Sequence, residues 1–310
     1  MEKGIRLLVL LLCSVLAQAL SPSGVLTLDD QAKIRAVLTA GQPYGQLASA
    51  HYSILGLKLF NAPVPKAQEA CAFLKAKLDS SNVESIYQAS TAAKALGNCK
   101  ITVNEQALSS SINDSVDMAT LYYAVSALTS LGMKFNAADV LKSLDANLRK
   151  DDSVTSSSYA LHIASQLPEE TNVDKYFDLI EDIVAQADEV DETYLQFDSL
   201  FQSGLFLDGA YKLAAKINKK PLITEDQAVM LGNYVLSYKS TQKMENAYSV
   251  VQGVTALSNN KFHVPVAFTR IGSMAVSTSA PNIKVQVSNL MSGSVGKVTV
   301  KALSVTPKKG

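Results

Sequence analysis

Three histidines, His51, His162 and His263, are the side chains best suited to acid–base or metal chemistry near neutral pH. His51 and His162 fall within segments of small and apolar residues, where a lone histidine is usually a packed polar group. His263 has no obvious acidic or cysteine companion. Scattered histidines with few sulfur ligands do not predict a zinc site. The sequence has no nucleophile elbow, dinucleotide-binding glycine turn or Walker loop, so we expect no cofactor and no catalytic residue.

Carboxylates are concentrated in one stretch, where Glu169 to Glu192 contains ten acidic residues and Lys175 as its sole base. Their helical spacing favours a solvated outer surface. A docking face for a basic partner and a divalent-cation site are the alternatives. We expect no metal here.

The first residues have the pattern of a secretory signal peptide. Lys3 and Arg6 precede an apolar run from Leu7 to Leu16, and Ala17-Gln18-Ala19 provides the small residues that a signal peptidase reads. We expect residues 1–19 to be a signal peptide cleaved after Ala19. A signal anchor is the alternative, although a run of about ten apolar residues is short for a bilayer.

Charge and composition then limit the partners. After cleavage the chain would keep 28 − 2 = 26 basic and 28 − 1 = 27 acidic residues, without a basic cluster. We therefore expect neither nucleic acid nor anionic lipid as a partner. A hydrophobic content of 47% over 310 residues is ample for a folded core.

Two further motifs predict modifications that occur in a secretory compartment. Cys71 and Cys99 would remain after cleavage, and two cysteines in an oxidising compartment most simply form a disulfide. Two buried thiols are the alternative. Asn113-Asp114-Ser115 is an acceptor sequence for N-glycosylation, so Asn113 is a candidate for a glycan that faces solvent.

These residues would be positioned by a repeat of about 35 residues. Tyr52, Tyr87, Tyr122 and Tyr159 each open a segment of small and aliphatic residues, at spacings of 35, 35 and 37. More polar amphipathic segments lie between them. The apolar positions of these segments recur every 34 to 36 residues, at Leu38, Leu74, Leu108, Leu144 and Ile180.

The repeating unit is predicted to be a helical hairpin with a polar outer helix and an apolar inner helix. Stacked hairpins bury each inner helix between its own partner and the neighbouring repeats. About six hairpins are expected in residues 20–259, with residues 191–217 forming a helical pair interrupted near Gly204. The sequence leaves open whether they form an open α/α solenoid or a closed toroid.

After residue 259 the hydrophobic period changes from helical to alternating. Residues 262–268, 282–290 and 297–305 alternate as half-buried strands do, and turn residues separate them. We therefore predict a mainly α protein in which residues 260–310 form an incomplete, β-sandwich-like segment.

Several of these stretches together resemble the ribophorin II family. They are "LASAHYSILGLKLF", the cysteine pair around "SNVESIYQAS", "LYYAVSALTSLG", "ETYLQF" and "NNKFHVPV", and the similarity runs from about Leu20 to Val305. Members of this family are non-catalytic subunits of the endoplasmic reticulum oligosaccharyltransferase. That complex transfers a preassembled glycan from dolichol diphosphate to asparagine of nascent chains, and its catalytic subunit is a different polypeptide.

The resemblance implies a lumenal scaffold that supports N-glycosylation and is not itself an enzyme. Its partners would be other oligosaccharyltransferase subunits and nascent polypeptides. Membrane contact is expected only through those partners or through a further C-terminal region.

The alternative is a soluble lumenal or secreted helical-repeat module that binds proteins. An enzyme within a closed toroid would need carboxylates or metal ligands at the ends of its inner helices. The inner segments instead are rich in Tyr, Ser, Ala and Leu.

Overall fold

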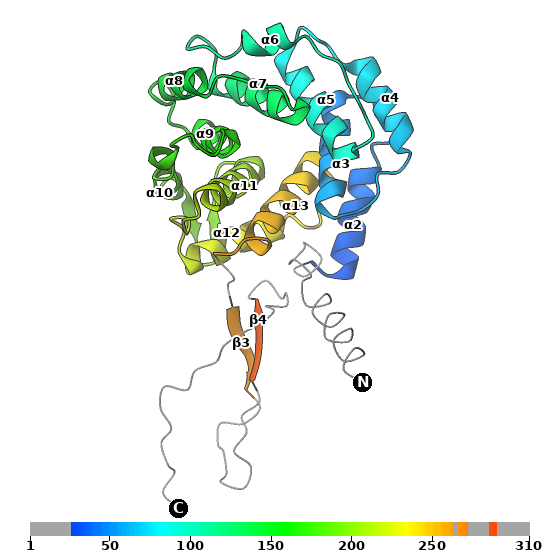
Figure 1. The fold of residues 1–310 in the computed structure, drawn as a ribbon. Helices are drawn as coiled ribbons and strands as arrows, with labels where there is room; N and C mark the ends of the chain where they lie inside the picture. Colours follow the sequence, from blue (N-terminus) through cyan, green and yellow to red (C-terminus); the bar gives the residue numbers. More distant parts are fainter. Residues whose placement is uncertain (1–25, 263–265, 272–284, 290–310) are drawn as a thin grey trace, which may run out of the picture.

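A ring of inner helices forms the centre of the molecule. The computed structural model describes residues 26–262, 266–271 and 285–289. Each inner helix packs against the next, and the last packs against the first, so the ring is closed (Figure 1). The inner helices are α3 (Leu47–Leu59), α5 (Val83–Leu96), α7 (Met118–Leu131), α9 (Val154–Gln166), α11 (Leu200–Ile217) and α13 (Met244–Ser258).

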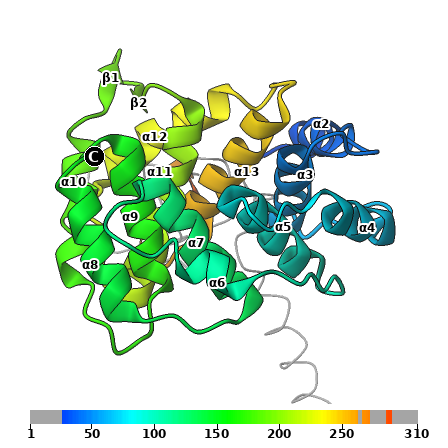
Figure 2. The ribbon, with the colours of Figure 1, turned by 90° about the horizontal axis from the view of Figure 1, so that it is seen from above.

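A second layer of helices surrounds this ring, as the view from above also shows (Figure 2). Each outer helix precedes its inner partner in the chain, which gives the predicted hairpin arrangement. The predicted mainly α fold of stacked hairpins is confirmed, in its toroidal form. The outer helices are α2 (Leu28–Thr39), α4 (Ala67–Lys77), α6 (Glu105–Ser109), α8 (Ala137–Leu148), α10 (Leu179–Val184) and α12 (Glu225–Ser237), with the 3₁₀-helix η2 (Asp174–Tyr176) before α10.

Side-chain caps fix where these helices begin. The Thr27 hydroxyl accepts from the Asp30 amide at 3.1 Å, and the Asp30 carboxylate accepts from the Thr27 amide at 3.3 Å, which forms a capping box at α2. Asp117 caps α7 by accepting from the Thr120 amide at 2.7 Å. Gly132 ends α7 with a φ of 70°, a left-handed conformation that glycine adopts without steric cost.

Contacts between the first and last hairpins close the ring. Helix α13 packs on both α2 and α3. The Lys239 ammonium, just after α12, lies 3.2 Å from the Asp30 carboxylate at the start of α2. The Tyr52 and Tyr248 rings, on α3 and α13, have centroids 5.5 Å apart. Residues about 200 positions apart in sequence therefore seal the toroid.

Closure explains how the apolar inner helices are buried. In α7, Leu121, Val125 and Leu128 are fully buried, and the small residues Ala124 and Ala127 are equally inaccessible. Small residues let neighbouring inner helices approach closely while their outer partners cover the opposite face. Each inner helix thus contacts two inner neighbours as well as outer helices.

Residues 188–217 differ from the predicted helical pair. They form β1 (Asp188–Val190) and β2 (Tyr194–Gln196), paired antiparallel with Asp188 opposite Gln196, and then the single helix α11. Gly204 does not interrupt this helix. A Cβ atom at Gly204 would lie 3.0 Å from the Ser249 carbonyl oxygen, so the glycine permits close packing of α11 on α13.

The described part of the C-terminal segment is a β-hairpin. Strands β3 (Val266–Ile271) and β4 (Val285–Asn289) pair antiparallel, with an irregularity between Phe268 and Arg270. Two of the predicted strand segments therefore contain strands. The third, at 297–305, and the signal sequence with Ala19 lie outside the described residues, as does His263.

The structure also contains the Cys71–Cys99 disulfide, with an S–S distance of 2.06 Å. It joins α4 to the segment that follows α5, on the outer side of the second hairpin. Cys99 is buried in a small apolar cluster with Ala70, Leu74 and Ala93. The bond thus adds a covalent link to packing that already holds the two helices together.

Candidate functional site

Tyrosines at the predicted spacing meet at the centre of the ring. The Tyr87 and Tyr122 hydroxyls are 3.0 Å apart, and the Tyr122 and Tyr159 rings stack with centroids 4.6 Å apart. Tyr52 and Tyr248 complete the cluster by the contact that joins α3 to α13. These side chains form a partition across the middle of the toroid, and we call it the tyrosine floor.

A large cavity lies on one side of the tyrosine floor. Its volume is about 1170 Å³, and every inner helix contributes to its wall from the C-terminal half of the helix. The pocket on the opposite side, which the N-terminal halves line, is far smaller at about 50 Å³. Tyr87, Tyr122 and Tyr248 border both spaces. We call the larger of these two spaces the central cavity.

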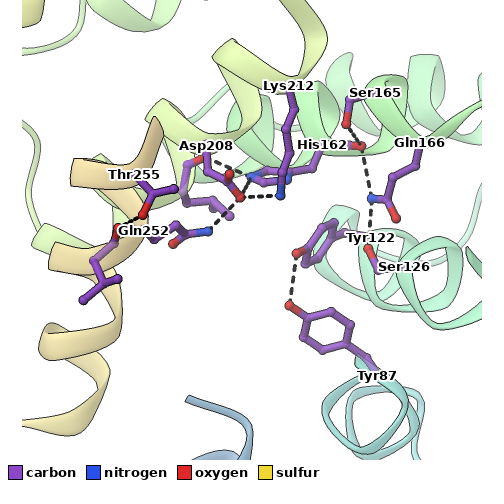
Figure 3. Close-up of polar contacts among 12 residues, drawn as sticks. Tyr87, Tyr122, Ser126, His162, Ser165, Gln166, Asp208, Lys212, Gln252 and Thr255 are labelled. Carbon is purple, nitrogen blue, oxygen red and sulfur yellow. Dashed lines mark hydrogen bonds and ion pairs between the residues drawn. The ribbon is translucent and has the colours of Figure 1, made fainter. Parts of the chain in front are cut away.

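A connected set of polar side chains lies on the wall of the central cavity (Figure 3). The Asp208 carboxylate accepts from the Lys212 ammonium at 2.6 Å and from the Gln252 amide at 3.0 Å. His162 Nε2 lies 3.0 Å from the Leu205 carbonyl oxygen and 3.9 Å from the same Asp208 oxygen. Helices α9, α11 and α13 thus bring a carboxylate, an ammonium, an amide and an imidazole together.

The electrostatics of this group hold Asp208 ionised. Burial alone would raise the pKa of Asp208, but the charge of the Lys212 ammonium and the hydrogen bonds from Lys212 and Gln252 together outweigh burial, so the pKa lies below its usual value. Burial also disfavours the charge on Lys212, yet its attraction to Asp208 leaves the lysine pKa raised. Burial lowers the pKa of His162 to about 4, so its imidazole is neutral at pH 7. The site therefore presents a carboxylate and an ammonium as a matched pair.

Four more lysines stand around the wall of the central cavity, at or just beyond the C-terminal ends of inner helices. Lys58 lies in the last turn of α3, Lys94 in that of α5 and Lys216 in that of α11, and Lys261 follows α13. Cations at a helix C-terminus offset the partial negative charge of the unpaired carbonyl groups. The lysines therefore have a structural role as well as facing a possible ligand.

This arrangement suits binding better than bond breaking. Among the described residues that line the central cavity, the carboxylates are Asp208 and Glu169, and Glu169 is exposed. Asp208 has a lowered pKa and is therefore a weak base at neutral pH. The described residues contain no group of three or more histidine, cysteine or carboxylate side chains placed to share a metal ion.

Two of the three histidines considered in the sequence, His51 and His162, lie in buried surroundings. His51 is buried, and the Thr91 hydroxyl lies 3.0 Å from its Nδ1. Burial lowers the pKa of His51 to about 4. His162 is equally buried but borders the central cavity. Both are packed polar groups, and His162 is brought to the site together with groups that the sequence analysis did not select.

The remaining candidate residues lie away from the cavity. Asn113 is in the loop after α6, where its side-chain amide donates to the Ser110 carbonyl at 2.8 Å and its carbonyl accepts from the Ser115 amide at 2.8 Å. The acidic stretch lies on the outer layer, around α10 and the β1–β2 hairpin. Its exposed carboxylates include Asp178, Glu181, Asp182, Asp188, Glu189, Asp191 and Glu192.

Sequence analysis missed Asp208, Lys212 and Gln252. An Asp–Lys pair four residues apart in an otherwise apolar segment was the available signal, because residues four apart share one face of a helix. The expected break at Gly204 concealed the continuous helix to which this pair belongs.

A comparison with family models identifies the helical ring. The model of the ribophorin II N-terminal domain matches residues 26–258, which run from the start of the described chain to the last residue of α13. Within the described residues, no helix combines the length and the apolar character needed to cross a bilayer. The match extends over the whole closed toroid and most of the sequence. The chain therefore belongs to the ribophorin II family.

Proposed function

We propose that this chain is a non-catalytic lumenal subunit of the endoplasmic reticulum oligosaccharyltransferase, in which it supports N-glycosylation as a scaffold. The family match over the whole toroid, residues 26–258, carries this proposal. The ribophorin II domain points to a subunit associated with that complex. The chain would assist transfer of the glycan from dolichol diphosphate to asparagine while another polypeptide carries out the reaction.

The chemistry of the central cavity supports a role without catalysis. A glycosidase-like reaction would require two carboxylates in complementary protonation states. Asp208 is instead paired with the Lys212 ammonium and accepts a hydrogen bond from the Gln252 amide, and His162 is buried and neutral. These groups are arranged to hold one another in place.

The outer layer offers surfaces for assembly. The acidic face around α10 and the β1–β2 hairpin is exposed, and no ion pair to Asp178, Glu181 or Asp182 occurs among the described residues. Unpaired carboxylates of one sign favour a partner with a basic surface. Other transferase subunits and nascent polypeptides are the partners that the proposal assigns to the chain.

Processing in the secretory pathway completes the proposal. Residues 1–19 would be removed after Ala19, and Asn113 would carry a glycan in the lumen. The half-buried Asn113 side chain sits in an otherwise largely polar loop, and Ser115 of the same acceptor sequence is exposed. The disulfide between Cys71 and Cys99 suits the oxidising lumen.

Co-purification tests the proposal. The tagged chain would be expressed in cells depleted of their own family member, and membranes would be solubilised in mild detergent. We expect the catalytic subunit to co-purify, and the glycan occupancy of a reporter glycoprotein to recover. An unrelated lumenal protein with the same tag is the control. Recovery of the chain without the transferase, together with unchanged reporter occupancy, would contradict the proposal.

A further inference from the structure

The Asp208–Lys212 pair is open to the central cavity although it is an ion pair. The Asp208 side chain is 18% exposed and the Lys212 side chain 56% exposed. Lys212 and Gln252 both bond to Oδ2 of Asp208. A hydroxyl group placed beside the pair can donate to the carboxylate and accept from the ammonium. Charged donors and acceptors form stronger hydrogen bonds than neutral ones.

The wider wall offers further groups of the same kind. The Gln166 amide donates to the Ser126 hydroxyl at 3.1 Å, and both residues line the cavity. Tyr87 and Tyr122 form the floor and supply hydroxyls and aromatic rings. Because donors, acceptors and aromatic surface all line the space, a ligand with many hydroxyls along an apolar ring skeleton matches it.

The charge of the cavity distinguishes a neutral ligand from an anionic one. Five lysines and two carboxylates line it, which gives 5 − 2 = +3 formal charges. The C-terminal halves of all the inner helices also line it, and each helix end contributes about −0.5 charge. Summed over the ring, the helix ends contribute about −3. The net positive charge of the side chains is therefore largely offset by the helix ends, and the cavity has no strong positive potential that would favour an anion.

Cavity size sets the length of the ligand. A volume of about 1170 Å³ exceeds the roughly 300–1,000 Å³ typical of small-molecule sites. A single sugar ring would leave most of this space filled with water. A short chain of several sugar rings would reach from the tyrosine floor to the rim.

We propose that the central cavity is a binding site for a neutral oligosaccharide. Asp208, Lys212 and Gln252 hold its hydroxyl groups, and the tyrosine floor receives the end of the chain. This role goes beyond the scaffold function and stands whether or not the chain assembles with the transferase. It assigns a ligand to a wall of the toroid where a partly buried ion pair faces the cavity.

Binding to defined oligosaccharides tests the proposal. The full chain, produced through the secretory pathway, would be titrated by calorimetry with maltopentaose, mannopentaose and chitopentaose, and with decaglutamate as an acidic peptide. We expect at least one pentasaccharide to bind with a Kd below about 1 mM, with little dependence on salt. Absence of binding by all three sugars would overturn the proposal, as would binding of decaglutamate alone.

Variants locate the site. D208N should weaken sugar binding by about tenfold, because it removes the charged acceptor. S130W places a large side chain on the α7 part of the cavity wall and should weaken binding, so it serves if D208N folds poorly. K58Q/K94Q removes two charges from the rim of the cavity and reports whether the ligand is anionic. The matched control K75Q/K77Q removes two exposed charges from the outer helix α4, away from the cavity, and should change the Kd by less than about twofold.

Each contrary result has a definite meaning. Unchanged affinity in folded D208N or S130W would overturn the assignment of the site. Loss of sugar binding in K58Q/K94Q, with strong salt dependence, would show an anionic site in place of a neutral one. Circular dichroism of every variant establishes that it is folded before the affinities are compared.

Discussion

Replacing Gly204 by valine should destabilise the toroid at the α11–α13 contact. A Cβ atom at this position would lie 3.0 Å from the Ser249 carbonyl oxygen and 3.3 Å from the Gln252 side-chain oxygen. Backbone cannot move aside as a flexible side chain can, and overpacking of this kind costs about 1–3 kcal/mol. The higher helix propensity of valine relative to glycine offsets roughly 0.4 kcal/mol of this cost. We expect a net loss of about 0.6–2.6 kcal/mol in the free energy of unfolding.

Urea and thermal unfolding, followed by circular dichroism, measure this loss. For a domain of this size, Tm should fall by about 1–10 °C. Gly45→Val is the matched control, because a Cβ atom at Gly45 would meet nothing within 4 Å. The control should change stability by less than about 0.5 kcal/mol. Equal stability of the two variants would refute the close approach of α11 to α13.

Three further predictions concern the disulfide, the buried histidines and the glycan. Replacing both Cys71 and Cys99 by serine opens a loop with a sequence separation of 28. The free energy of unfolding should fall by about 3–4 kcal/mol in urea titrations, and an unchanged value would contradict the prediction. Burial lowers the pKa of His51 and His162 to about 4 from 6.5, so the unfolded chain binds these protons first as pH falls. The neutral form of both histidines, which the fold requires, is fully present above about pH 6.5. As pH falls from about 6.5 to about 4, the free energy of unfolding should therefore decrease by about 3 kcal/mol for each histidine. H162Q should make the free energy of unfolding depend less on pH between pH 7 and 4.5, and the same dependence as in the unchanged protein would contradict the role given to His162. N113Q should remove one glycan from the secreted chain, seen as loss of the mass shift on enzymatic deglycosylation; an identical shift in both proteins would exclude Asn113 as the acceptor.

The hairpin repeat could be predicted because its signals are local. The spacing of Tyr52, Tyr87 and Tyr122 follows from equivalent positions on successive inner helices. The Tyr87 and Tyr122 rings meet in the structure, and the Tyr52 ring contacts that of Tyr248. Apolar positions such as Leu74 and Leu144 mark the outer helices and are fully buried. Helical periodicity is a property of neighbouring residues, so the sequence alone contains it.

Closure of the ring could not be predicted in the same way. Curvature depends on a small rotation between successive hairpins, and the errors accumulate around the array. The deciding contacts join α13 to α2 and α3, and the Lys239 ammonium after α12 to Asp30 of α2, 209 residues away. No local pattern encodes such a contact.

The central cavity was missed for a related reason. A glycine within an apolar run usually weakens a helix, so Gly204 indicated a break. Close packing on α13 outweighs that cost. Once α11 is continuous, Asp208 and Lys212 fall one turn apart on the same face, beside Gln252 of α13. Recognising the site required knowledge of the neighbouring helix.

The distance between α3 and α13 shows directly whether the ring of helices is closed in solution. Spin labels at Lys58 and Asn259, both exposed near the C-terminal ends of these helices, can be measured by double electron–electron resonance with the native disulfide intact. Packed helices lie about 8–10 Å apart, so a closed toroid should give one population below about 30 Å including the label arms. An open array would separate the two helices by five such spacings, on the order of 45 Å before the labels are added, and a population at that distance would show that the ring is open.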